Sequence, residues 1–146
     1  MRPSLSLANR QRTWKFDVPF ILRVVHFARP ACVACVRSNA APLSHLRAVE
    51  AFILGDRAIA RVHDEFFADP TPTDVITFHH GEILIGAGVV TENARSYGHT
   101  PNEEAALCFI HGLLHLAGWD DLEPAEANEM ARLQERIFKY ARRMVV

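Results

Sequence analysis

Residues 105–121 read AALCFIHGLLHLAGWDD, and this stretch decides how the chain folds. Apart from His111 and His115, nearly every residue from Ala105 to Ala117 is apolar, which predicts a helix buried on all sides. Histidines four residues apart lie on the same helical face, so both imidazoles can reach one metal ion. A shared ion would also satisfy two polar groups that are costly to bury without partners.

The residues after this helix offer a third ligand. Gly118 ends the helix and lets the chain turn back, which brings Asp121 round toward the histidines, with Asp120 as a neighbouring competitor. Two nitrogens and one carboxylate oxygen leave one position of a tetrahedral zinc ion open, as in catalytic sites. Two histidines at this spacing are also common by chance, so an ordinary helix face is the alternative interpretation.

Two blocks of the sequence resemble the YbeY family of zinc-dependent bacterial endoribonucleases. The segment from His111 to Asp121 is similar to the family signature His-Gly-x-Leu-His-Leu-x-Gly-aromatic-Asp followed by a third histidine. Residues 72–78, PTDVITF, resemble its Pro-Thr-Asp-Val strand entry, and residues 81–83 stand where the family has Gly-acid-Ile. Order and spacing agree with the family from roughly Asp56 to the C-terminus.

Two positions depart from the family pattern. Asp121 stands where the family has its third histidine, so the resemblance assigns Asp121 rather than Asp120 as the third ligand. A carboxylate is an acceptable zinc ligand, although harder than an imidazole. Phe67 stands six residues before Thr73, where the family usually carries an arginine, a natural phosphate contact. We therefore expect RNA to be held differently here.

The resemblance implies a zinc-dependent endoribonuclease of single-strand type with one Zn²⁺ per chain. It implies a role in ribosomal RNA processing, 16S rRNA maturation and ribosome quality control, with ribosomal RNA and the small ribosomal subunit as partners. The expected catalytic residues are His111, His115, Thr73 and Asp74, and the expected metal ligands are His111, His115 and Asp121.

Other classes of function stay open on the sequence. A His-Glu-x-x-His zinc protease uses its glutamate as a base, and Gly112 occupies that place, so peptide hydrolysis by that route lacks its proton acceptor. A zinc hydrolase acting on a substrate other than RNA is one alternative. A catalytically weakened, ribosome-associated RNA-binding protein is another, with Phe67 marking the lost catalysis.

Composition agrees with a single domain over residues 1–146. No apolar run approaches the roughly 20 residues that span a bilayer, so we expect no membrane partner. Three cysteines, an odd number, argue against a disulfide framework and favour a reducing, cytoplasmic location. Cys32 and Cys35 form a Cys-x-x-Cys pair with no second pair to complete a zinc site, and we interpret them as structural thiols.

Charge is distributed unevenly along the chain. The net charge is −1, yet residues 1–48 contain eight basic side chains and a single acid, Asp17. This basic third predicts a surface that faces phosphates, and we expect Arg10, Arg12 and Lys15 to bind RNA. A solvated basic face explains the same pattern equally well.

The predicted fold is α+β, a small mixed sheet of about four strands packed with about five helices. The metal site lies at the C-terminal end of the buried helix, in a groove formed by the loops around Thr73 and His79–His80, of which at most one histidine faces the groove. Asn102 is expected to cap the buried helix, and a loop is expected through Pro30 and Pro42. The other expected elements are helices 17–27, 56–66, 89–97 and one from Pro124, and strands 46–54, 74–78 and 82–85.

Overall fold

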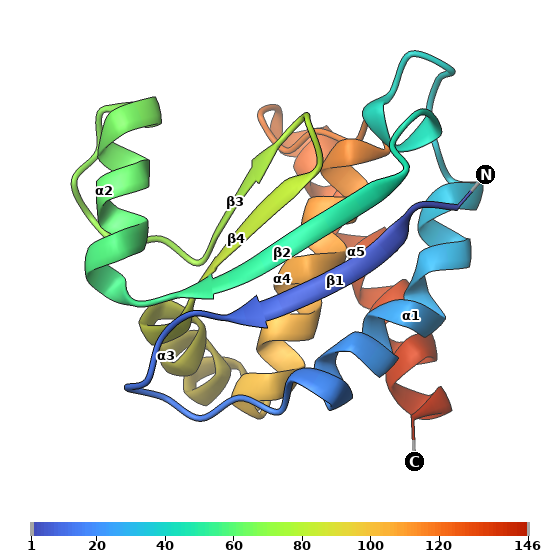
Figure 1. Cartoon of the computed structure of the whole chain (residues 1–146). Coiled ribbons are helices and arrows are strands. Elements are labelled where there is room, and N and C mark those ends of the chain that lie inside the picture. The colour runs from blue at the N-terminus through green and yellow to red at the C-terminus, as the bar shows by residue number, and fades with distance from the viewer. Residues whose placement is uncertain (1, 146) are drawn as a thin grey trace.

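A four-stranded mixed sheet forms the centre of the fold (Figure 1). The structure is a computed structural model and describes residues 2–145. Strands β1, β2 and β4 run parallel, and β3 lies antiparallel to β4 at one edge, in the order β1-β2-β4-β3. The strands are β1 (Ser4–Asn9), β2 (Ala48–Leu54), β3 (Val75–Phe78) and β4 (Glu82–Gly86).

Helices cover both faces of this sheet. One face packs against α1, α3, α4 and α5, which share the larger hydrophobic core with β2 and β4 (Figure 1). On the other face, Ile59 of α2 packs against Ile76 and Leu84 in a smaller cluster. The helices are α1 (Val18–Ala34), α2 (Asp56–Phe67), α3 (Ala87–Tyr97), α4 (Pro101–Leu116) and α5 (Pro124–Met144), with a 3-10 turn at Pro42–Ser44. The α+β fold predicted from the sequence is confirmed.

Helix α4 is the core helix that the apolar run predicted. Phe109, Ile110, Leu113 and Leu114 are fully inaccessible to solvent, whereas Leu107, His111 and His115 form a partly exposed stripe that lines a cavity. The predicted cap was wrong, because the Thr100 side chain accepts from the Glu103 backbone N–H and Glu103 returns a bond to the Thr100 N–H.

Asn102 has a different role from the one expected. Its side-chain oxygen accepts the Asp17 backbone N–H at 2.8 Å, which ties the start of α1 to the first turn of α4. This bond fixes the end of α4 that lies farthest from His115.

Two further sequence-based expectations were wrong. Helix α1 continues through Pro30 to Ala34, where a loop was expected, because Ala28 and Cys32 are fully buried and their packing offsets the backbone bond that proline removes. Strand β1 was not predicted, although Ser4–Leu7 alternates polar and apolar residues as a half-buried strand does. Over residues 2–145, no helix combines the length and apolar character needed to cross a membrane.

The end of β4 sets the position of the segment that enters β3. Gly86 donates its N–H to the Asp74 carbonyl at 2.7 Å, and a Cβ on Gly86 would lie 2.0 Å from the Thr73 carbonyl oxygen. Only a glycine permits two backbones to approach this closely. The contact therefore holds Thr73 and Asp74 beside α4.

Candidate metal centre

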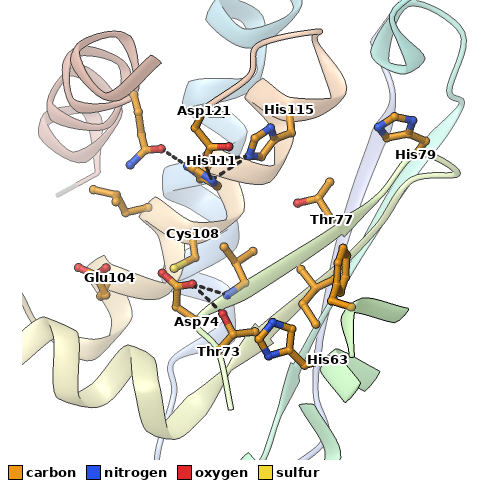
Figure 2. Close-up of a pocket in the computed structure, with 15 residues that line it drawn as sticks. His63, Thr73, Asp74, Thr77, His79, Glu104, Cys108, His111, His115 and Asp121 are labelled. Atoms are coloured by element: carbon orange, nitrogen blue, oxygen red, sulfur yellow. Dashed lines mark hydrogen bonds and ion pairs between the residues drawn. The ribbon is translucent and has the colours of Figure 1, made fainter. Parts of the chain in front are cut away.

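Two histidines and one aspartate converge at the C-terminal end of α4 (Figure 2). His111 and His115 project from the last two turns of the helix, and Asp121 lies in the loop that follows. Gly118 adopts φ +99°, a left-handed conformation that reverses the chain after the helix. The reversal returns Asp121 to the histidine face.

The distances among the three side chains suit a single ion. The two Nε2 atoms are 3.0 Å apart, and Asp121 Oδ2 lies 3.6 Å from His111 Nε2 and 3.5 Å from His115 Nε2. Ligands about 2.0–2.1 Å from a tetrahedral zinc ion are separated by roughly 3.3–3.4 Å. The three atoms thus have the spacing of three corners of such a site.

Hydrogen bonds orient both imidazoles toward this point. His115 Nδ1 donates to the Trp119 carbonyl at 3.0 Å, and His111 Nδ1 donates to Gln134 Oε1 at 2.6 Å. With the proton on Nδ1, each neutral ring presents the lone pair of Nε2 to the other and to the carboxylate. A cation between them satisfies all three groups at once.

The electrostatics favour the metal-binding forms. Burial lowers the pKa of His111, and its Gln134 hydrogen bond opposes this only in part, so the ring is neutral near pH 7. Cys108, one turn before His111, is buried, and burial raises the pKa of its thiol well above the usual value. It therefore stays a protonated core thiol rather than a fourth ligand.

The three side chains lie at one end of a cavity of about 500 Å³ between α4, β3 and the end of α2. Figure 2 shows Thr73, Asp74 and His63 across the cavity from the histidine pair, with Thr77 between them. His79 lines the cavity, whereas His80 stacks on Phe78 and is not among the lining residues. Both histidines lie in the turn that follows β3 rather than in the strand itself.

A model of the family described as endoribonuclease YbeY matches residues 28–142 of the chain. The chain belongs to the YbeY family. The resemblance seen in its two sequence blocks is thus confirmed across most of its length.

Individual members of the YbeY family align at moderate identity. The endoribonuclease YbeY of Kineococcus radiotolerans is 34% identical over 55% of this chain and 56% of its own length. That of Gluconobacter oxydans is 30% identical over 86% of this chain and 77% of its own. The chain thus spans about half of the first relative and three quarters of the second.

A solved structure has the same fold. The solution structure of TM1509 from Thermotoga maritima matches 94% of this chain and 88% of its own, with a TM-score of 0.58 and 23% identity.

The structure brings together most of the residues singled out in the sequence. His111, His115, Asp121, Thr73 and Asp74 all line the cavity. Asp74 Oδ1 accepts the Val75 N–H at 2.8 Å and the Thr73 hydroxyl at 3.4 Å, which orients its carboxylate.

The predicted RNA-binding residues lie elsewhere. Arg10, Arg12 and Lys15 are exposed in the loop between β1 and α1, and none of them lines the cavity. That loop ends at Asp17, which contacts Asn102 at the start of α4. His115 lies at the other end of α4, roughly 20 Å away along the helix axis. Arg10 also lies over the Phe52 ring, 4.2 Å from its centroid.

Sequence reasoning missed the residues that support the ligands. Gln134 of α5 and the Trp119 carbonyl orient the imidazoles, and His63 lines the cavity together with Phe67, which was already singled out from the sequence. Gln134 had a sequence signal, because it lies one turn after the buried Met130, at the margin of the apolar stripe of α5. The Trp119 carbonyl had none, since it is a backbone group.

Asp121 and Asp120 provide a matched pair of variants. Asp121→Ala should weaken divalent metal binding by at least about a hundredfold, because it removes a ligand. Asp121→His should retain the metal. Asp120→Ala should bind metal as the wild type does, because Asp120 Oδ1 caps the turn through the Leu122 N–H. Competition with a chelating dye measures the metal affinity of all three variants. Metal loss in Asp120→Ala alone would make Asp120, and not Asp121, the third ligand.

Gln134 gives a second prediction at this site. Gln134→Ala should weaken metal binding roughly 10–100-fold, because the His111 ring loses the acceptor that fixes its proton on Nδ1. Gln134→Glu keeps an acceptor oxygen and should restore affinity. Arg136→Ala, an exposed change on the same helix, is the control. Equal affinity in Gln134→Ala and Arg136→Ala would show that the Gln134 contact does not orient the ligand.

Proposed function

We propose that this protein is a zinc-dependent endoribonuclease folded as one domain over residues 1–146. The observation that carries the proposal is the group His111, His115 and Asp121 at one end of an open cavity, in a chain of the YbeY family. The curated relatives are named as endoribonucleases, which supports RNA as the substrate class for this cavity.

The donor set supports zinc as the metal, at one ion per chain. Two imidazole nitrogens and one carboxylate oxygen suit zinc better than magnesium or calcium, which prefer oxygen ligands. Three protein ligands leave one coordination position for water or substrate, as in catalytic rather than structural zinc sites. A zinc ion held there would activate water and polarise a phosphoryl oxygen for phosphodiester hydrolysis.

The chain's own residues then have distinct roles. His111, His115 and Asp121 hold the ion, while Thr73 and Asp74 face the same cavity from the entry to β3. We assign Asp74 and Thr73 to proton transfer and to substrate contact, because both side chains line the cavity and share a hydrogen bond of 3.4 Å.

The position of Gly112 argues against a zinc protease. A Cβ on Gly112 would lie 2.6 Å from Ile83 Cδ1 and 3.0 Å from Thr77 Oγ1, so the tight packing of α4 against the sheet leaves no room for a glutamate. The proton acceptor of the His-Glu-x-x-His proteases therefore has no place at this position.

The finer part of the proposal concerns the biological substrate. We propose ribosomal RNA of the small subunit, with roles in 16S rRNA maturation and ribosome quality control in the cytoplasm. Membership of the YbeY family supports this assignment.

The decisive experiment combines metal analysis with RNA cleavage. Purified protein should contain about one zinc per chain and cleave structured ribosomal RNA, and a chelator should abolish cleavage until zinc is restored. The His111→Ala/His115→Ala double variant should lose both properties, whereas Cys32→Ser/Cys35→Ser should keep both.

Other results would redirect the proposal. Stoichiometric zinc in the double histidine variant would place the metal elsewhere. Zinc with ester or peptide hydrolysis but no RNA cleavage would indicate a hydrolase of another class. Ribosome co-sedimentation without cleavage would indicate an RNA-binding protein that has lost catalysis.

Salt dependence tests the proposed RNA contacts of the N-terminal loop. Replacing Arg10, Arg12 and Lys15 together with Gln should weaken RNA binding and reduce the slope of log K against log salt by roughly two, if each contacts one phosphate. The control triple removes the same charge from the outer face of α5, at Arg132, Arg136 and Lys139, which are exposed. If only the α5 triple variant lowers the slope of log K against log salt, RNA binds to α5 and not to the N-terminal loop.

A further inference from the structure

Two adjacent phenylalanines at the end of α2 are unusually exposed. Phe66 and Phe67 each expose 58% of their surface, although aromatic rings gain most when buried. Their surroundings differ. Phe67 lines the cavity that contains the metal ligands, whereas Phe66 packs edge-on against Phe78, 5.0 Å between centroids, and is not among the lining residues.

We propose that Phe67 is the platform on which an unpaired RNA base stacks when its phosphate reaches the metal ligands. This inference rests on the proposed endoribonuclease function and specifies how substrate is held. Aromatic rings that border a nucleic-acid groove bind single strands through their faces, and such stacking tolerates any base because every base has a π-face.

The charge of the cavity favours a neutral contact. The lining residues include the carboxyl groups of Asp74, Glu104 and Asp121, and among the lining residues that the structure describes there is no Lys or Arg. A phosphate in this cavity therefore has no cationic side chain to pair with apart from a protonated histidine. A base carries no charge, so it can contribute binding energy where additional phosphate contacts cannot.

The ring of Phe67 has a neighbouring ring on one side and is otherwise largely exposed. It leans on His63 with centroids 5.9 Å apart, and His63 Nδ1 bonds the Thr71 carbonyl at 2.8 Å. Ala68 ends α2 in a left-handed conformation, φ 55°, which turns the chain away immediately after Phe67. A partial restraint of this kind lowers the entropy lost when a ligand stacks.

Phe67 and the three candidate metal ligands line the same cavity, which is the basis for placing a base and its phosphate there together. Figure 2 shows His63, the ring on which Phe67 leans, across the cavity from His111 and His115. A volume of about 500 Å³ is in the range of pockets that enclose small ligands, which suits one nucleotide rather than a duplex.

The test compares two oligomers of equal charge. Both are 2′-O-methyl hexamers, one carrying adenine at every position and one abasic at every position. The affinity of each for the zinc-loaded protein is measured, and the oligomer is then checked to confirm that it was not cleaved. Wild type should prefer the adenine hexamer, and Phe67→Leu should reduce that preference about tenfold, because leucine keeps the apolar volume and loses the stacking face. Phe67→Trp should keep the preference.

Phe66→Leu is the matched control, because Phe66 is equally exposed and lies outside the cavity lining. It should leave the preference within about twofold of wild type, given that exposed substitutions change little away from a ligand. Unchanged thermal stability and zinc content in Phe67→Leu establish that the variant is folded.

Three outcomes overturn the inference. An equal preference for adenine in wild type and Phe67→Leu would show that Phe67 does not stack on a base, while leaving the endoribonuclease proposal intact. A change in oligomeric state in Phe67→Leu with unchanged affinity would instead identify a contact between copies of the chain. If wild type binds neither hexamer and cleaves no RNA, the proposed function fails, and the inference fails with it.

Discussion

The site depends on one constraint, the close approach of two partly buried imidazoles on a helix whose neighbouring residues are almost all apolar. His111 and His115 face one another at 3.0 Å with both Nδ1 protons already committed to Gln134 and the Trp119 carbonyl. Two lone pairs and a carboxylate at this separation repel without a cation between them. The turn at Gly118 brings Asp121 to this site, and α5, which packs in the main core, contributes Gln134 to it.

The opposite wall of the cavity depends on close packing at two glycines. Gly86 lets the end of β4 approach the Thr73 carbonyl, and Gly112 lets α4 pack against the side chains of Ile83 and Thr77. A Cβ would lie 2.0 Å from the Thr73 oxygen at the first position and 2.6 Å from Ile83 Cδ1 at the second. Glycine at both positions therefore lets α4, β3 and β4 lie close together beside the cavity.

Local chemistry explains which features could be predicted from the sequence. The apolar helix, the pairing of His111 with His115 and the last helix follow from short-range patterns, namely a run of apolar residues, i and i+4 spacing, and a three- to four-residue stripe. Strand β1 and the continuation of α1 through Pro30 depend on packing against residues distant in the chain. The same is true of Gln134, which reaches His111 from another helix, and of Phe67, whose position at the cavity wall depends on where α2 ends.

The acidity of the cavity has a thermodynamic consequence for the proposed function. Asp74, Glu104 and Asp121 give the lining a negative potential, although burial raises the pKa of Glu104 and its contact with His99 only partly reverses this. A phosphodiester entering such a space is repelled unless a cation is present. Metal binding and substrate binding must then strengthen each other by the same factor, since coupling between two ligands is reciprocal. RNA that occupies the cavity would therefore strengthen binding of the ion. The acidic wall would also make binding of the anionic substrate conditional on the metal.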